Sequence, residues 1–120
     1  VFQPIQHAAI AALTGSMDFT RGMCRVYNRR RDVLIEGLNR LGWKVRKNPA
    51  TFFVWTRVPR PGITSGDFAS AVLKKSGVLF TPGRGFGEYG EGYIRIALTV
   101  EEDRLREAVD RIEKAGFVYA

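Results

Sequence analysis

The 120-residue sequence contains only one cysteine, Cys24, and one histidine, His7. A single cysteine cannot form an internal disulfide, which favours a reducing, cytoplasmic setting. One histidine and one cysteine cannot supply the cluster of nitrogen and sulfur ligands that a zinc site needs, so no metal-ligating residue is assigned. His7 lies in a strongly apolar segment, where a packing role is favoured over a ligand or catalytic role.

Long apolar runs are also missing. No stretch could cross a bilayer, and the N-terminus lacks the basic region of a secretory signal, so we expect no membrane partner. The chain begins with Val1 rather than Met, which suggests a processed or excised piece of a longer protein. A chain of 120 residues is long enough for one compact domain that buries about two-thirds of its unfolded surface.

The sequence carries a net charge of +7, which raises nucleic acid or anionic ligands as partners and equally fits a protein whose acidic remainder is absent. Arg21, Arg25 and Arg29 fall four apart, with further arginines close by at Arg30, Arg31 and Arg40. One interpretation is a small basic nucleic-acid-binding module that uses residues 21–31. The favoured one is a solvated or partner-facing side, because the aromatic residues serve packing and do not interleave with the arginines for base stacking.

The spacing of apolar residues and helix breakers predicts the order helix, helix, strand, strand, helix, strand, strand, helix. The predicted helices cover 1–13, 18–41, 64–75 and a last helix capped by Thr99. The predicted strands cover 43–46, 52–58, 78–80 and 93–98. This order indicates a two-layer α+β fold, a small mixed sheet with helices packed on one face, preceded by the long helix 18–41.

The last predicted strand carries a charged residue at its centre. Side chains alternate along a strand, so Ile94, Ile96 and Leu98 face the helices while Tyr93, Arg95 and Ala97 face the other way. Burying an unpaired guanidinium is costly. Arg95 therefore either opens onto a cleft, where its planar fork suits a carboxylate held by two hydrogen bonds, or forms a structural salt bridge with Glu88 or Glu91.

The linker before this strand holds five glycines and matches G-x-G-x-x-G at Gly85, Gly87 and Gly90. A dinucleotide site needs a helix after such a loop, whereas here a strand follows. A kinase-type loop needs a lysine on the following strand, and none occurs between Gly92 and Lys114. The favoured interpretation is that the glycines allow positive φ and close backbone approach in an irregular loop.

Several segments together resemble the C-terminal part of class I/II pyridoxal-phosphate-dependent aminotransferases of fold type I. They are 27–32 (YNRRRD), 41–43 (LGW), 48–55 (NPATFFVW), 77–83 (GVLFTPG) and 86–97 (FGEYGEGYIRIA). They run almost end to end and in the order of the family. The opening stretch 2–10 (FQPIQHAAI) resembles the subgroup that includes diaminopimelate and aspartate/alanine-type enzymes.

This resemblance implies a domain organisation and a site. Residues 1–16 would be a remnant helix of the large pyridoxal-phosphate-binding domain, residues 17–120 would form the small C-terminal domain, and the long helix would bridge the two. Arg95 would bind the α-carboxylate of the amino acid, and Phe86 would lie near the substrate mouth. The implied partners are an amino acid and a 2-oxo acid, the missing N-terminal large domain, and a second subunit in a homodimer.

One part of the family pattern is absent. The lysine that forms the Schiff base with the cofactor lies, in the family, in a Ser/Lys-rich motif upstream of the stretch resembling 2–4. None of the lysines has such a context: Lys44, Lys47, Lys74, Lys75 and Lys114. We therefore expect no catalytic and no cofactor-binding residue in this chain, no cofactor bound to it alone, and no activity without the remainder of the enzyme.

Overall fold

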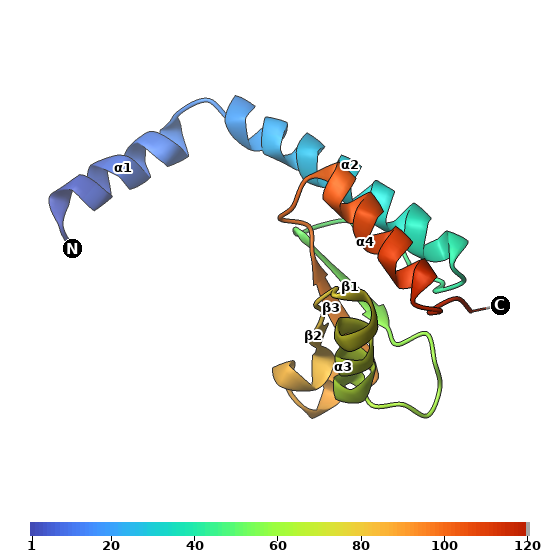
Figure 1. Cartoon of the computed structure of the whole chain (residues 1–120). Coiled ribbons are helices and arrows are strands. Elements are labelled where there is room, and N and C mark those ends of the chain that lie inside the picture. The colour runs from blue at the N-terminus through green and yellow to red at the C-terminus, as the bar shows by residue number, and fades with distance from the viewer. Residues whose placement is uncertain (120) are drawn as a thin grey trace.

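A three-stranded antiparallel sheet lies against three helices in the computed structural model, which describes residues 1–119 (Figure 1). The strands are β1 (Phe53–Arg57), β2 (Thr81–Pro82) and β3 (Tyr93–Ala97), in the order β1-β3-β2. The two-layer α+β prediction is confirmed. The predicted mixed sheet is wrong, because β3 pairs antiparallel with both of its neighbours within the described residues.

The helices that cover the sheet are α2 (Asp18–Arg40), α3 (Ser65–Ser76) and α4 (Glu102–Lys114). Their apolar stripes meet one face of β3, where Ile94 and Leu98 are fully buried and Ile96 nearly so. Close packing of α2 on α4 depends on Gly37, because a Cβ there would lie 2.8 Å from Val109 Cγ2. The core therefore lies between the helices and one face of the sheet, the face that the alternation in 93–98 predicts.

Three local predictions differ from the structure. Residues 43–46 are not a strand, because Lys44 has a left-handed φ of 56° that interrupts extended backbone. Residues 78–80 are not a strand either, because pairing with β3 starts only at Thr81. Thr99 does not cap the last helix. Glu101 occupies the N-cap position, without a side-chain cap hydrogen bond.

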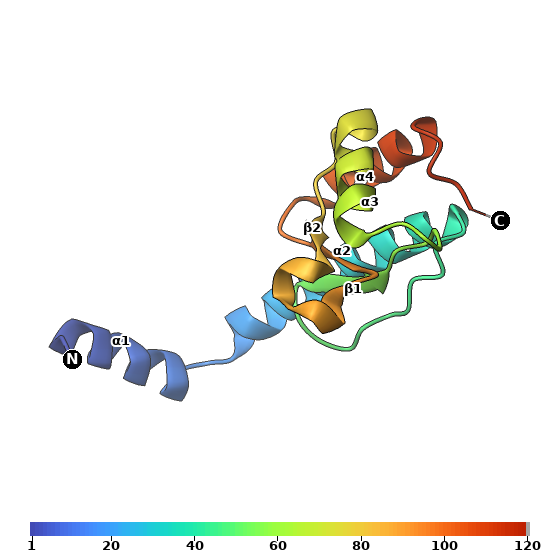
Figure 2. The same ribbon diagram turned by 90° about the horizontal axis from the view of Figure 1, so that it is seen from below.

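Helix α1 (Gln3–Thr14) projects away from the rest of the molecule (Figures 1 and 2). Every residue of α1 is exposed, including the apolar side chains Ile5, Ile10 and Leu13. The predicted helix is therefore present, and its assignment to a large domain stays a prediction. None of the helices among residues 1–119 combines the length and the apolar character needed to cross a membrane.

Candidate functional site

The face of the sheet turned away from the helices is open and aromatic. Strand β1 presents Phe53 and Trp55 on this face, and β3 presents Tyr93 and Arg95. Trp55 and Thr81 flank Arg95 in the register on either side, so the guanidinium stands on the central strand of the sheet. The structure therefore places Arg95 on the face that the sequence predicts, away from Ile94 and the helices.

The Arg95 guanidinium lies over two aromatic rings, those of Phe53 and Phe86. Its Cζ is 4.1 Å from the centroid of the Phe53 ring and 4.5 Å from that of Phe86. Among residues 1–119 no hydrogen bond or ion pair engages it, and neither Glu88 nor Glu91 forms the predicted structural salt bridge. Aromatic faces attract a guanidinium without using its N–H donors. The donors of Arg95 therefore remain free to bind a planar anion such as a carboxylate.

Further aromatic contacts extend this surface along the sheet. The Trp55 ring lies 5.6 Å from that of Tyr93 in a stacked arrangement and 5.7 Å from that of Phe86, edge on. Arg57 Nε donates to the Tyr93 hydroxyl at 3.2 Å. The sequence interpretation missed Phe53 and Trp55. The signal was available, since alternation along 52–58 places Phe53, Trp55 and Arg57 on one face.

The glycine-rich loop carries Phe86 over Arg95. It consists of two short 3₁₀ turns, η1 (Gly83–Phe86) and η2 (Glu88–Gly90), joined at Gly87, where φ is +114°. The backbone crosses itself at the base of the loop: a Cβ on Gly83 would lie 2.1 Å from the Gly90 oxygen. The loop leads into β3 and not into a helix. The glycines thus serve close approach and positive φ, as predicted, and not a dinucleotide site.

Glu91 fastens this loop to the start of α3. Its Oε1 accepts hydrogen bonds from the backbone N–H of Ser65 at 2.7 Å and of Gly92 at 2.8 Å. These donors, Ser65 first, hold the pKa of the Glu91 carboxyl below its ordinary value. Glu91 is therefore a structural anchor at a helix N-terminus and is not available as a partner for Arg95.

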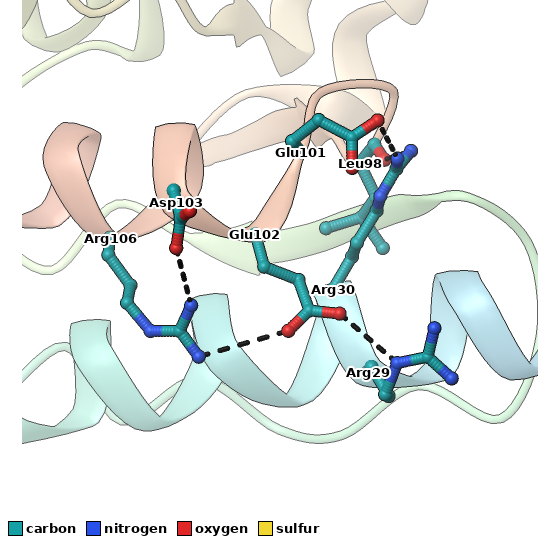
Figure 3. A network of polar contacts seen from close by, with 7 residues as sticks. All are labelled: Arg29, Arg30, Leu98, Glu101, Glu102, Asp103 and Arg106. Atoms are coloured by element: carbon teal, nitrogen blue, oxygen red, sulfur yellow. Dashed lines mark hydrogen bonds and ion pairs between the residues drawn. The ribbon is translucent and has the colours of Figure 1, made fainter.

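The arginines of α2 are used within the protein. Figure 3 shows Arg29 bound to Glu102, the first residue of α4, and Arg30 bound to Glu101 and to the Leu98 carbonyl in the segment between β3 and α4. Arg31 donates to the Asn48 carbonyl at 2.9 Å and pairs with Asp32. Hydrogen bonding to Lys47 and, less strongly, to Arg31 holds the pKa of Asp32 below its ordinary value.

Arg30 and Arg31 are buried, so both the nucleic-acid interpretation of residues 21–31 and the solvated-face interpretation are wrong for these two residues. The stripe consists of Arg21, Arg25 and Arg29. Within residues 1–119, Arg21 and Arg25 are exposed and form no ion pair with a residue outside α2. Among residues 1–119, no group of His, Cys, Asp or Glu side chains lies close enough together to hold a metal ion. Cys24 is exposed and not in a disulfide.

Comparisons with known proteins agree on one family. The model of the family "Aminotransferase class I and II" matches residues 1–112. The chain is 50% identical over 119 residues to an LL-diaminopimelate aminotransferase of Halothermothrix orenii, covering 99% of this chain and 30% of that protein. It is 53% identical over 113 residues to the LL-diaminopimelate aminotransferase of Moorella thermoacetica, covering 94% of this chain and 29% of that protein.

Solved structures give the same result. The substrate-bound BacF structure from Bacillus subtilis superposes with a TM-score of 0.88 at 37% identity, over 97% of this chain and 30% of that one. An alanine aminotransferase from Pyrococcus furiosus superposes with a TM-score of 0.85 at 36% identity, over 92% of this chain and 29% of that one. The chain therefore spans about 30% of the length of the curated relatives it matches. None of these relatives bears the name of a nucleic-acid-binding protein.

Proposed function

The chain belongs to the class I and II aminotransferase family, and we propose that it is the substrate-carboxylate-binding part of an enzyme that transfers an amino group between an amino acid and a 2-oxo acid. In this proposal Arg95 binds the α-carboxylate and Phe86 lies at the substrate mouth. The observation that carries it is the guanidinium of Arg95 on an open face, in contact with the Phe53 and Phe86 rings and with no hydrogen-bond partner among residues 1–119.

The two rings explain how the site would orient a substrate. The guanidinium lies over both rings and keeps its N–H donors unused, and the edge of this planar fork can donate two parallel hydrogen bonds to a carboxylate. Fixing the carboxylate in one plane fixes the orientation of the attached Cα. Positioning of this kind contributes to rate, because a reacting bond must be aligned before it can break.

Enzymes of this family act with pyridoxal phosphate, which supplies an electron sink for the carbanion formed at Cα. We propose that no residue of this chain holds that group. All five lysines are exposed, and Lys47 is engaged by Asp32, so none has the desolvated surroundings that activate an amine. We therefore assign no step through the cofactor to this chain, and propose that the chain is inactive without the rest of the enzyme.

The remaining assignments follow from the same proposal. Residues 1–16 would belong to the large domain, which fits the complete exposure of α1, and residues 17–120 to the small domain. The names of the relatives favour LL-diaminopimelate as the amino acid. We also propose a homodimer, as the resemblance implies, in the cytoplasm, which the single unpaired Cys24 supports.

The test is substitution of Arg95 in the complete enzyme. Arg95→Ala should lower kcat/KM for the amino acid by about 30-fold to several thousand-fold, the usual loss when one partner of a charged hydrogen-bonded pair is removed. Arg95→Lys should recover only part of this, because it restores the charge without the planar fork.

Two controls make the result specific. Arg60→Ala removes the same charge from an exposed loop and should leave kcat/KM unchanged. The 120-residue chain alone should show no transamination and no cofactor absorbance. An Arg95→Ala enzyme with an unaltered kcat/KM would rule out the carboxylate-binding role.

A further inference from the structure

We propose that Asn48 is a positioning residue for the carboxylate site. Its side-chain amide holds the turn before β1 in the shape that keeps the Phe53 ring against Arg95. The inference rests on the proposed function, because it concerns how the Arg95 guanidinium is held for a carboxylate. Asn48 acts through Phe53 and is assigned no contact with the substrate.

The turn before β1 has a strained backbone. Thr51 has a φ of +71°, in the left-handed region that a β-branched residue seldom adopts. Strain of this kind persists only where neighbouring contacts enforce it. Asn48 Nδ2 donates to Ala50 O and, at 3.0 Å, to Phe53 O. Thr51 Oγ1 accepts from Phe53 N at 3.2 Å. Side chains of the turn therefore hold both polar backbone groups of Phe53.

The ladder of the sheet does not hold Phe53. Leu98 N donates to Phe52 O at 2.9 Å, so Phe52 points its carbonyl at the segment that continues β3. In an antiparallel pair the next residue points its backbone groups the other way, although Phe53 stands opposite Ala97 in the register. Phe53 is also the first residue of β1. The direction of its backbone, and with it the ring 4.1 Å from Arg95 Cζ, therefore depends on the turn.

The other end of the turn is tied to α2. The Asn48 carbonyl accepts from Nη1 of the buried Arg31 at 2.9 Å. Arg31 Nε donates to Asp32 at 3.0 Å, and Asp32 also pairs with Lys47. The helix thus fixes the backbone of Asn48 while its side chain reaches Phe53. Asn48 therefore links the long helix to a ring that contacts the guanidinium.

The Asn48 amide acts as a donor. Its Oδ1 is buried and has no hydrogen-bond partner among residues 1–119, although an unpaired buried acceptor costs free energy. An aspartate at this position would set an oxygen against the carbonyls of Ala50 and Phe53, and an alanine would leave both without the amide. The shape of the turn thus depends on the Nδ2 donor, which a substitution can remove without altering Arg95.

A second asparagine offers a matched control. Asn39 Oδ1 accepts from Val45 N at 2.6 Å, and Asn39 Nδ2 donates to Val45 O at 3.1 Å. This amide also holds backbone groups of a segment outside the helices. That segment carries neither of the rings that contact Arg95, so loss of the Asn39 amide should perturb the fold locally without moving the guanidinium.

The test is a double-mutant cycle in the complete enzyme. Asn48→Ala should lower kcat/KM for the amino acid roughly 5- to 50-fold, because a displaced guanidinium binds the carboxylate out of line. In the Arg95→Ala background the same change should lower kcat/KM less than about 2-fold, since residues that act through one another are not additive. Equal fold losses in the two backgrounds would overturn the proposal, because they would mark a general structural defect.

Two further variants make the kinetic result specific. Asn48→Asp keeps the size of the side chain but lacks the Nδ2 donor, so it should lose at least as much kcat/KM as Asn48→Ala. A parental kcat/KM in Asn48→Asp would show that the amide does not hold the site. Asn39→Ala should leave kcat/KM unchanged, and a loss as large as that of Asn48→Ala would count equally against the proposal.

A resonance of Arg95 reports its position without substrate. In the 120-residue chain the aromatic rings shift the Arg95 Nε–H signal, and Phe53→Leu identifies the share of Phe53. Asn48→Ala should move this signal towards its position in Phe53→Leu, whereas Asn39→Ala should not. An unmoved signal in Asn48→Ala would refute the link from Asn48 to Arg95. A parental kcat/KM in Arg95→Ala would refute the carboxylate role instead, so the two failures are told apart.

Discussion

The two faces of β3 show how one strand serves two purposes. Ile94 and Leu98, on the helix side, are completely buried, whereas Tyr93 and Arg95, one residue away, are only partly covered. Ile94 and Leu98 make their contacts within the chain, whereas Arg95 keeps N–H donors that a ligand could use. Residues on the open face can therefore change binding with little effect on folding, while residues on the covered face cannot change without affecting the core.

The largest effect on stability should come from a substitution on the covered face of β3, compared with one at the neighbouring residue on the open face. Ile94→Ala should lower the free energy of unfolding by about 2–5 kcal/mol, because it leaves a cavity among α2, α3, α4 and the sheet. Arg95→Ala should change it by about 1 kcal/mol or less, the scale of a partly exposed cation–aromatic contact. Urea unfolding of the 120-residue chain measures both. Equal losses would mean that Arg95 also belongs to the folding core.

A second contrast separates two arginines, Arg30 and Arg95. Arg30→Ala should destabilise the chain by about 1–3 kcal/mol, because the buried Leu98 carbonyl loses its donor from Arg30 Nη1. Its exposed neighbour Arg25 provides the control, and Arg25→Ala should change the free energy of unfolding by about 0.5 kcal/mol or less. Thermal or urea unfolding decides the point, and an Arg30→Ala chain as stable as the Arg25→Ala chain would contradict the structural role.

The smallest effect concerns the loop that holds Phe86 over the open face. Because the folded state lowers the pKa of Glu91, the carboxylate stabilises the fold above the unfolded-state pKa, and this contribution disappears as pH falls through the lower folded-state pKa. The Tm difference between the parent chain and Glu91→Gln should therefore be largest near neutral pH and disappear as the pH falls below the folded-state pKa of Glu91. A difference independent of pH would show that the charge of Glu91 has no part in anchoring the loop.

The parts predicted from sequence are those that a local period specifies. Alternation in 93–98 identified the covered residues of β3 and the outward direction of Arg95. Helical spacing located α2 and α3, and Thr64 caps α3 as expected, since its side chain accepts from Asp67 N. The resemblance of several segments predicted the family, which the family match confirms.

The parts that were missed depend on contacts between distant residues. Nothing near Lys44 marks it for a left-handed conformation, so 43–46 had the pattern of a strand. The anchoring of Glu91 on Ser65 joins residues 26 positions apart. The hydrogen bonds of Arg30 depend on where the fold places the segment just before α4. Likewise, the ring of Phe53 beneath Arg95 requires the register of β1 on β3, which no single segment specifies.

The crossing of Gly83 and Gly90 has a consequence for engineering. Each glycine lies so close to the backbone of the other that neither position can carry a side chain, whereas a Cβ added at Gly85, nearer the tip, would have no atom within 4 Å. The base of the loop, at Gly83 and Gly90, therefore tolerates no substitution, while its tip at Gly85 has room for a larger residue. Libraries that vary residues 84–86 and keep Gly83 and Gly90 could change which substrates the proposed site accepts without changing the fold.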